Sequence, residues 1–438
     1  MRRKRNNDGG FALVIVLWLA AAMATMALSL AHTIRLEQRR CANTVSTLQA
    51  EAAMEAATRY LVSLLQSEDW TSSLPDDETG RLDDVPVGNA RFWVVGRPTE
   101  ENGDSEAAAG LIDEASKLNL NTATADMLKA LPGMTAELAA AIIDWRDTDE
   151  DPQSGGAESE TYLRLSRPYR CKNAPFSSPE ELRLVYGADI DLLFGRDRNL
   201  NGLQDPWEKD GSLDVLRQQT FPEQENGLLE YVTVWSREHN RQADGSERVN
   251  VNDRQATQEL QQLIEQQLGA EKAQQVIGNV STGNSNHADL LAFYRASTLT
   301  AQEFAKITDG LTTTDDEWIE GRINVNTAPV PVLACLPGLD ENDARALVTF
   351  REQNSESLGS IAWVADVLEA ERTAEAGQHM TTQISRISAD VVAVGDADKG
   401  MRRSFFVFDT TTDLPTIVYR RDRAALGWAL GVTSEELF

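Results

Sequence analysis

The feature that most constrains this chain is an uncharged apolar run near the N-terminus, from Phe11 to Ala31. The run is 21 residues long, about the length that an α-helix needs to cross the ~30 Å hydrocarbon core of a bilayer. A buried core helix would usually carry a polar stripe, and a cleaved secretory signal has a shorter apolar region of about 7–15 residues. The run therefore predicts a retained membrane-spanning helix, with an uncleaved or atypical signal as the alternative.

Basic residues precede the run, and a helical pattern follows it. Positive charge beside a spanning helix stays in the cytoplasm, so the cluster at residues 2–5 predicts that the bulk of the chain lies on the far side of the membrane. No Gly or Pro interrupts residues 35–66, where apolar residues recur mostly at spacings of three to five. They are Leu36, Val45, Leu48, Ala52, Ala56, Leu61 and Leu65. This pattern predicts one continuous helix whose outer half is amphipathic.

The composition is acidic, with a formal net charge of −28 at pH 7 over 438 residues. Such a surface repels nucleic acid and anionic lipid, so we interpret it as a solubilising, cation-binding exterior. The length allows two or more compact units, and 41% hydrophobic residues suffice for real cores. Three cysteines, Cys41, Cys171 and Cys335, leave at least one unpaired in an exported chain. A bridge between Cys171 and Cys335 stays open.

The N-terminus consists of a short basic leader ending in Gly10, then Phe11 and a hydrophobic helix that continues into an amphipathic one. This arrangement resembles the precursors of type IV pilins and type II secretion pseudopilins. The resemblance implies that a prepilin peptidase cuts between Gly10 and Phe11 and methylates the new N-terminus. Most members carry Glu at the fifth mature position, where its carboxylate can neutralise a neighbouring α-amino group inside an apolar filament. Ile15 stands there in this chain, a departure typical of the K-type minor pseudopilin at the filament tip.

Strand-like segments occupy two distant parts of the chain. The stretch "ARFWVVG" at 90–96 is matched only near the end, by "ISRISADVVAVG" at 384–395 and by the β-branched and aromatic residues of 402–422. An isolated strand needs ladder partners, so we expect an α+β fold in which a small antiparallel sheet is interrupted by a large, mainly α insertion. This organisation resembles the K-type pseudopilin, and the resemblance implies a type IV pilin-like fold with a long N-terminal transmembrane helix.

The expected organisation places boundaries along the whole chain. They are a prepilin leader at 1–10, the transmembrane and amphipathic helix at 11–70, the first part of the sheet domain at 71–115, an inserted α-domain at 116–380 and the C-terminal strands at 381–438.

The insertion contains an internal repeat. Residues 118–146, "LNLNTATADMLKALPGMTAELAAAIIDWR", align without gaps to residues 323–351, "INVNTAPVPVLACLPGLDENDARALVTFR". In each copy Asn and Thr are expected to cap a first helix, and Pro-Gly to force a tight turn into a second. The turns are Pro132–Gly133 and Pro337–Gly338, and the expected buried seam of the first copy is Leu128, Leu131, Leu138, Ile142 and Trp145. A partial copy at 249–269 keeps the Asn-x-Asn start and lacks the Pro-Gly turn.

This repeat is a helix-hairpin-helix pattern, which in some proteins binds nucleic acid. There the hairpin glycine brings backbone N–H groups to a phosphate, and nearby Lys or Arg supply positive charge. A competence-type DNA receptor is therefore the main competing hypothesis. Residues 111–152 hold nine acidic side chains against Lys117, Lys129 and Arg146, so the electrostatic contribution to phosphate binding is missing. We interpret both hairpins as packing or protein-binding modules.

The strongest chemical motif is "DRNLNGLQDPWE". Ca²⁺ takes about six to eight oxygen ligands, alternate residues turn theirs inward, Gly permits the sharp bend and the last Glu can bind bidentately. Asp197, Asn199, Asn201, Gly202, Asp205 and Glu208 occupy positions 1, 3, 5, 6, 9 and 12 of such a loop, with the Leu203 carbonyl at position 7. The flanking segments do not form a clear EF-hand helix pair, so we expect a lone structural Ca²⁺ loop. An acidic Asn-Gly surface turn is the alternative.

A second candidate is "DWRDTDEDPQSGGAESETYL" at 144–163. It resembles the acidic loop that follows the first hairpin in K-type pseudopilins, where calcium is bound. The resemblance implies Asp147, Asp149 and Glu158 as oxygen donors. Without the resemblance, a solvated acidic loop explains the stretch equally well.

Signals for catalysis are weak. The four histidines, His32, His239, His287 and His379, are scattered and fall in no metal or triad spacing. No Walker loop or Rossmann fingerprint occurs in the sequence. We expect a protein that is not an enzyme.

The resemblance also implies partners and a location. It implies a single-pass inner-membrane protein with its bulk in the periplasm of a Gram-negative type cell, docked to I-type and J-type minor pseudopilins. That complex would start the pseudopilus, with the bulky insertion preventing another subunit from stacking above, and no nucleic acid is expected to bind. A type IV pilus minor pilin is the closest rival. Residues 190–300 resemble an enlargement relative to smaller members of the family.

Overall fold

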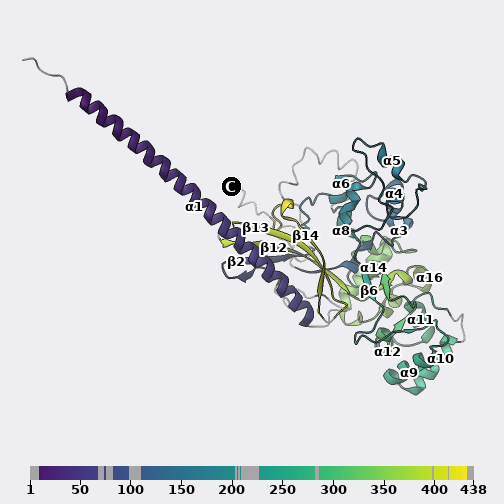
Figure 1. Cartoon of the computed structure of the whole chain (residues 1–438). Helices are drawn as coiled ribbons and strands as arrows, with labels where there is room; N and C mark the ends of the chain where they lie inside the picture. The colour runs from purple at the N-terminus through teal and green to yellow at the C-terminus, as the bar shows by residue number, and fades with distance from the viewer. Residues whose placement is uncertain are drawn as a thin grey trace, which may run out of the picture.

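One long helix, α1 (Gly9–Ser67), projects from a folded head in the computed structural model of this chain (Figure 1). The structure describes residues 9–67, 74, 82–97, 110–202, 205, 208, 226–281, 286–396, 399–412 and 414–431. The prediction of a continuous helix is confirmed. By length and composition α1 is the one helix among the described residues that could cross a membrane, and its most apolar window has a mean hydropathy of 2.3 and is not buried. The leader residues 1–8 lie outside the described part.

The character of α1 changes at Ser46, where the helix reaches the head. Apolar side chains before this point face outward, and those of Phe11 and Trp18 are 73% and 75% exposed. From Ser46 onward one face is buried by small and then larger residues, including Ala50, Ala53, Ala57, Leu61 and Leu65. The buried positions recur every three or four residues, which is the spacing of one helix face. The outer half thus has one buried face, but of the residues that predicted it only Leu61 and Leu65 lie there. Those at 36, 45, 48 and 52 are exposed and Ala56 is half-buried.

The buried face of α1 lies on an antiparallel sheet with strand order β1-β2-β12-β13-β14. The strands are β1 (Val85–Val87), β2 (Ala90–Val95), β12 (Arg386–Val394), β13 (Met401–Asp409) and β14 (Thr416–Asp422), and β3 (Ile112–Asp113) pairs with β12. Phe92 and Val94 of β2 pack with Phe406 and Phe408 of β13 in the core under α1. The expectation that the isolated first strand pairs with the C-terminal strands is confirmed, because Val392 of β12 lies opposite Trp93.

The hairpin between β12 and β13 holds α1 at the point where it enters the head. Ser46 Oγ donates a hydrogen bond to the Asp396 carbonyl at 3.2 Å, and the Asp396 N–H donates to Gln49 Oε1 at 3.1 Å. A Cβ on Gly395 would lie 2.1 Å from the Ser46 carbonyl oxygen, and one on Gly400 would lie 2.6 Å from the Thr47 nitrogen. The glycines therefore permit a backbone approach that no other residue allows.

The insertion between β3 and β12 is mainly helical and lies beside the sheet, away from α1 (Figure 1). Its helices are α3 (Ala125–Lys129), α4 (Ala136–Arg146), α5 (Ser159–Leu163), α6 (Ile190–Phe194), α8 (Leu228–Tyr231), α9 (Thr257–Leu268), α10 (Ala270–Ser281), α11 (Leu290–Ser297), α12 (Ala301–Ala305), α13 (Val330–Leu333), α14 (Glu341–Gln353), α15 (Val364–Val367) and α16 (Ala370–Thr373). Short 3-10 helices are η1 (Glu114–Ser116), η2 (Pro179–Leu184), η3 (Thr308–Gly310), η4 (Ser355–Ser357), η5 (Ile361–Trp363) and η6 (Gly377–His379), and η8 (Ala424–Leu426) follows β14. A single buried apolar cluster runs through the insertion from Leu118 to Met380.

Each Asn-x-Asn segment begins with a two-residue strand in a parallel ladder. The pairs are β4 (Leu118–Asn119) with β5 (Val232–Thr233), β7 (Val249–Asn250) with β8 (Leu311–Thr312) and β10 (Ile323–Asn324) with β11 (Met380–Thr381). An antiparallel pair, β6 (Arg237–His239) with β9 (Trp318–Glu320), joins the middle of the insertion. In all three segments the first Asn side chain accepts a hydrogen bond, at 2.9 Å, from the N–H two residues on.

The two full copies of the repeat form helix pairs around their Pro-Gly turns. The five predicted seam residues of the first copy are all buried. Gly133 and Gly338 have φ angles of +69° and +78°, which explains why glycine stands at both turns. Thr124 caps α3 as expected, whereas Pro329 occupies the cap position of α13 and makes no side-chain bond. The partial copy also ends in a helix pair, α9 and α10, around Gly269 at φ +90°.

The cysteines are all free. Cys171 and Cys335 are buried, and Cys41 is exposed on α1. The open possibility of a Cys171–Cys335 bridge is therefore not realised in this structure.

Candidate functional site

Three acidic side chains meet where the end of α4 faces the start of α5. Asp144 lies in the last turn of α4, Asp147 is its C-cap and Glu158 is the N-cap of α5. Oxygen atoms of these three carboxylates all lie within 4.8 Å of one another, and among the described residues no other group of acidic, His or Cys side chains meets this criterion. We call this group the acidic cluster.

Burial and mutual repulsion make the acidic cluster unfavourable without a cation. Burial first, and then the charges of Asp144 and Asp147, raise the pKa of Glu158 to about 7. The pKa values of Asp144 and Asp147 are also raised, again by burial first. Both Glu158 carboxylate oxygens and Asp147 Oδ1 are buried without a hydrogen-bond partner in the described structure. Orphaned, converging carboxylate oxygens of this kind fit a hard divalent cation such as Ca²⁺.

The surrounding loop fixes Asp144 in place. Its carboxylate accepts hydrogen bonds from the N–H groups of Gln153 at 3.1 Å and Ala157 at 2.7 Å. A Cβ on Gly156 would lie 2.0 Å from Asp144 Oδ2, so glycine is required for the loop to close over this carboxylate. The loop therefore presents a preformed carboxylate rather than a freely moving one.

The outcome for the second predicted metal loop is mixed. Asp147 and Glu158 belong to the acidic cluster, whereas Asp149 does not and instead accepts a hydrogen bond from the Asp151 N–H. Asp144 was missed, because in sequence it reads as one residue of the repeat's second helix. Its spacing of three from Asp147 was the available signal, since residues three apart lie on one face of a helix. Calcium binding here stays a prediction.

The first predicted calcium loop curls around its own carboxylates. Asp197 accepts hydrogen bonds from the N–H groups of Asn201 at 3.1 Å and Gly202 at 2.6 Å, and Glu208 accepts from those of Arg198 at 2.6 Å and Asp205 at 2.9 Å. Leu203 lies outside the described residues. Burial raises the pKa values of Asp197 and of Glu208 to about 7. The Asn199 and Asn201 amides both donate to Asp205 Oδ2, at 2.8 and 3.3 Å, whereas the carboxylates of Asp197, Asp205 and Glu208 do not all converge within 4.8 Å. Calcium binding in this loop stays a prediction.

A buried arginine joins this loop to the sheet. Arg403 of β13 is fully buried and donates to the Asn199 carbonyl at 2.6 Å and the Leu200 carbonyl at 2.9 Å. The same guanidinium makes two hydrogen bonds with the carboxylate of Asp390 in β12, at 3.1 and 2.7 Å. The Asn199 amide also donates to the Trp428 carbonyl at 2.8 Å. The loop is therefore part of the junction between insertion and sheet.

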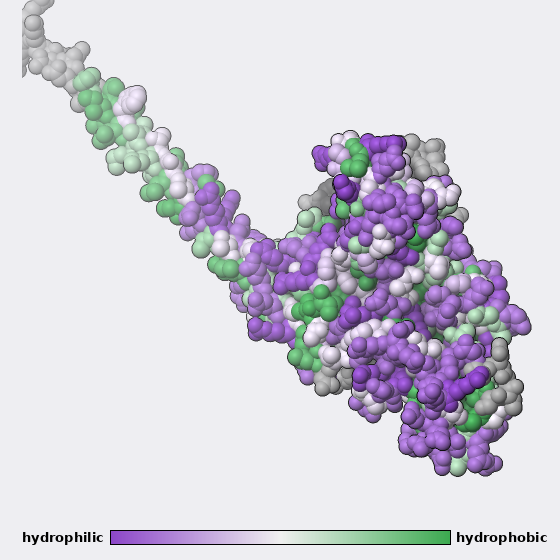
Figure 2. Space-filling view, turned by 45° about the vertical axis from the view of Figure 1, so that its right-hand side comes forward, coloured by the Kyte–Doolittle hydropathy of each residue, from purple (hydrophilic) through white to green (hydrophobic). Residues whose placement is uncertain are grey.

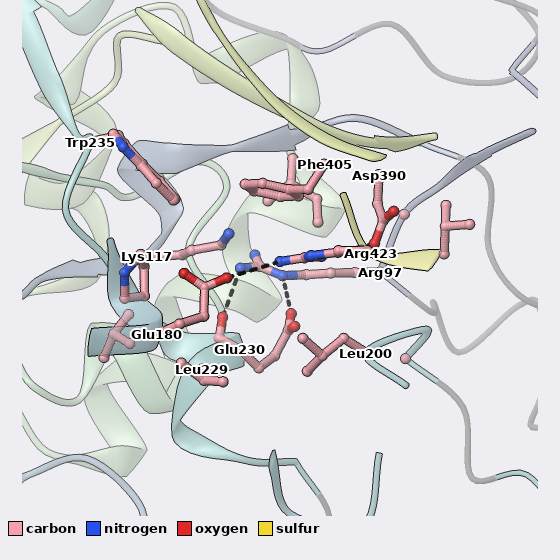
Figure 3. A pocket seen from close by; sticks show the side chains of 16 residues that line it. Arg97, Lys117, Glu180, Leu200, Leu229, Glu230, Trp235, Asp390, Phe405 and Arg423 are labelled. Carbon is pink, nitrogen blue, oxygen red and sulfur yellow. Dashed lines mark hydrogen bonds and ion pairs between the residues drawn. The ribbon is translucent and has the colours of Figure 1, made fainter. Parts of the chain in front are cut away.

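Next to this junction is a cavity of about 60 Å³ lined by charged side chains (Figure 3). Arg97 Nε donates to Glu230 Oε1 at 2.5 Å, and Arg423 Nη1 pairs with Asp390 at 2.8 Å. Figure 3 shows Glu180 and Glu230 pointing toward the guanidinium groups of Arg423 and Arg97. The opposite charges neutralise one another. We therefore interpret the cavity as a place where ion pairs hold the insertion on the sheet, rather than as a ligand site.

The turn of the second hairpin packs against the chain beside an acidic helix cap. At the start of α14, Asp340 Oδ1 accepts from the N–H groups of Asn342 and Asp343, and Asp340 Oδ2 binds Arg372 at 2.7 Å. A Cβ on Gly338 would lie 3.3 Å from the Arg372 carbonyl oxygen, so this turn packs against the chain. The processing residues Gly10 and Phe11 lie in the first turn of α1.

Two family models described as "Type II secretion system (T2SS), protein K" match the chain, a first-domain model over residues 110–193 and a second model over residues 323–384. The type II secretion system protein K of Klebsiella pneumoniae is 28% identical over 203 residues, which cover 42% of this chain and 59% of that protein. The protein of the same description from Pectobacterium carotovorum subsp. carotovorum is 46% identical over 56 residues, 13% of this chain and 17% of that protein. The alignments thus span less than two thirds of either relative.

A solved structure is also similar. It is a chain of the crystal structure of the GspK-GspI-GspJ complex from the type 2 secretion system of enterotoxigenic Escherichia coli, with 14% sequence identity and a TM-score of 0.44. The comparison covers 89% of this chain and 99% of that chain. The acidic cluster lies inside the first matched family range, whereas the loop at 197–208 lies outside both ranges.

Proposed function

Because this chain belongs to the type II secretion system protein K family, we propose that it acts as a minor pseudopilin of that system. The observation that carries the proposal is that one sheet supports both parts of the molecule. The exposed apolar helix continues into a half that packs on this sheet, and the insertion that the family models match extends from it. Exposed apolar side chains in the first half of α1, such as those of Phe11, Trp18 and Leu30, supply the anchor. The remainder of α1 is fixed on the sheet from which the insertion extends.

We further propose that the head caps the pseudopilus and initiates its assembly. The insertion stands to one side of the sheet and of the axis of α1 (Figure 1), where its bulk would obstruct a further subunit. Ile15 supports a terminal place, because it offers no carboxylate for the α-amino group of a subunit above. Two proteins named with the Escherichia coli homologue, GspI and GspJ, suggest I-type and J-type minor pseudopilins as partners.

Processing and location follow from the same proposal. A prepilin peptidase would cut between Gly10 and Phe11 and leave the new, methylated N-terminus at the first turn of α1. The apolar segment would then lie in the inner membrane, with the head in the periplasm. The helix-hairpin-helix units would serve as packing modules, which agrees with the acidic caps at α14.

Calcium is proposed as a structural ligand at two places. Asp144, Asp147 and Glu158 would hold one ion in the acidic cluster. Asp197, Asn199, Asn201, Asp205 and Glu208, with the Leu203 carbonyl, would hold another in the loop beside Arg403. Bound Ca²⁺ would neutralise the buried carboxylates. No catalytic role is assigned to any residue.

The test is co-purification of the full-length protein, in detergent, with the I-type and J-type minor pseudopilins of the same cell. We expect the three proteins to elute together and duplex DNA not to be retained. Val45→Asp with Leu48→Asp, at exposed apolar positions of α1, should weaken the complex, whereas Arg59→Asp on the same helix should not. Elution of this chain alone, together with retention of DNA, would support the competence-type alternative instead.

A further inference from the structure

The upper part of the head carries an exposed surface in which arginines surround apolar side chains. Figure 2 shows hydrophobic atoms beside strongly hydrophilic ones at the top of the head, where Figure 1 places α5. The exposed apolar residues of this region are Leu163, Leu184, Tyr186 and Ile190, each about half exposed. The exposed arginines are Arg164, Arg167, Arg170 and Arg183. We call these eight residues the basic–apolar face.

Two tyrosines bring these residues together from separate elements. Tyr162 and Tyr169 have ring centroids 5.2 Å apart. The Tyr162 hydroxyl accepts a hydrogen bond from the Tyr186 N–H at 3.1 Å, and the Tyr169 hydroxyl donates to the Leu184 carbonyl at 2.6 Å. Leu163 follows Tyr162 directly in the chain, so the end of α5 and the segment after η2 lie side by side. Each tyrosine thus uses its polar group to fix the backbone that displays an apolar side chain.

Three of the four arginines of the face are not neutralised by a described residue of the protein. Arg164 pairs with Glu160, but Arg167, Arg170 and Arg183 make no ion pair with any described residue. This is unusual in a chain with a formal net charge of −28, where acidic side chains outnumber basic ones 69 to 41. An ordinary solubilising surface would also not expose four large apolar side chains among the arginines. Arginine, tyrosine and leucine around a partly apolar centre are typical of a protein–protein interface.

We propose that the basic–apolar face is a docking surface for an acidic protein segment that carries apolar side chains. The arginines would pair with carboxylates at the rim, and Leu163 and Tyr186 would receive apolar side chains at the centre. Charge complementarity favours an acidic partner here because most of the remaining surface repels one. A short segment can contact the face alone, whereas an anionic bilayer is broad and would also meet the acidic surface around it, which disfavours a bilayer as the occupant. The inference rests on the proposed function only for its setting, a head exposed to other periplasmic proteins.

The test uses the full-length protein in neutral detergent and a fluorescent ten-residue peptide that alternates carboxylate and apolar side chains. Its counterparts replace the apolar residues by serine or the carboxylates by lysine. We expect anisotropy to show binding of the acidic–apolar peptide alone, with an affinity that falls as salt increases. R167E/R170E should weaken binding by about tenfold or more, and L163S/Y186S should weaken it without changing its salt dependence.

The matched control is R241E/K306E, which makes the same change in net charge at exposed positions outside the face. It should leave binding unchanged. Equal binding by R167E/R170E and the control would overturn the proposal, as would binding of anionic phosphatidylglycerol vesicles through the face in place of the peptide. Co-purification with the I-type and J-type proteins is measured in parallel on every variant. Its loss in the unmodified protein would count against the proposed function, whereas loss of peptide binding alone counts against this inference.

Discussion

At the scale of single residues, Glu158 predicts how stability depends on pH and calcium. Its pKa is raised to about 7 in the folded protein, so the folded state holds this proton more tightly than the unfolded state does. Without calcium, the contribution of Glu158 to stability is therefore lost as the pH rises through about 7. Calcium requires the ionised form, so stabilisation by calcium should grow over the same range.

The measurement is the melting temperature of the full-length protein at pH 5.5 and pH 8, with calcium or with chelator. A ligand at about 100 times its Kd adds about 2.7 kcal/mol, so we expect a rise of about 5 °C at pH 8 and a smaller one at pH 5.5. Glu158→Gln should reduce the rise, and Asp149→Asn, outside the acidic cluster, should not. An equal calcium effect at both pH values would argue against the cluster as the binding site.

Gly395 predicts the cost of disturbing the contact between the hairpin and α1. A methyl group at this position would lie 2.1 Å from the Ser46 carbonyl, so Gly395→Ala should force the helix and hairpin apart. We expect a loss of about 1–3 kcal/mol in the free energy of unfolding, measured by denaturant titration. Gly359→Ala is the matched control, because nothing lies within 4 Å of its added methyl group. Similar losses for both variants would mean that the close approach is unimportant.

The structure brings Asp147 and Glu158 together, as the loop's resemblance implies, and it buries the helix seam that the period predicts. Calcium binding at the two carboxylates stays a prediction. Asp144 and Arg403 were missed, because their roles depend on what the fold brings to them. Arg403 in particular contacts a carbonyl more than 200 positions away in the chain, and no local pattern encodes that contact.

At the scale of elements, Arg403 predicts that β13 and the loop at 197–202 act together. Arg403→Met removes both hydrogen bonds to loop carbonyls while Arg423 still pairs with Asp390. Loss of one partner from a buried polar network typically costs about 3–5 kcal/mol, so the variant should unfold at clearly lower denaturant.

A second readout separates this element effect from general destabilisation. Hydrogen exchange of the loop amides at Asn201 and Gly202 should accelerate in Arg403→Met more than exchange within β2. Arg402→Met, at the neighbouring position and paired with Glu51 on the surface, is the control and should change neither quantity much. Uniform acceleration across the sheet would contradict a specific coupling of strand and loop.

Long periodic elements could be predicted from sequence and very short ones could not. The helix α1 is long enough for its apolar run to stand out, and the strands β2, β12, β13 and β14 are long enough for β-branched and aromatic content to mark them. The parallel ladders at the Asn-x-Asn segments have two residues per strand, too few for any period. Their partners also lie far along the chain, so only the fold identifies them.

At the scale of the whole molecule, α1 is one uninterrupted helix, so its length sets the rotation of the head about the helix axis relative to the N-terminal half. One alanine inserted after Arg39 would turn the N-terminal half of α1 by about 100° relative to the head, whereas seven inserted residues would restore its orientation to within about 20°. We expect the single insertion to abolish co-purification with the I-type and J-type proteins and the seven-residue insertion to retain part of it. Equal co-purification for the two insertion variants would indicate that the rotation of the head relative to the N-terminal half of α1 does not affect assembly.

The overall arrangement was predictable in outline because the N-terminal helix and the sheet leave different patterns in the sequence. An apolar rod and a set of strands far apart in sequence imply an insertion, and the structure has that organisation. The way the insertion is fixed on the sheet was not predictable, since it depends on buried ion pairs such as Arg403 with Asp390 and Arg97 with Glu230. Charged residues in sequence give no sign of which opposite charge they will meet.

The grip of the β12–β13 hairpin on α1 has a mechanical consequence. A stiff helix that is fixed to the head by this hairpin transmits rotation fully. Any turn of its N-terminal half therefore becomes an equal turn of the head. The insertion stands off the axis of that helix and would sweep an arc as it turns (Figure 1). A small rotation of the N-terminal half of α1 would thus become a much larger displacement at the far edge of the insertion.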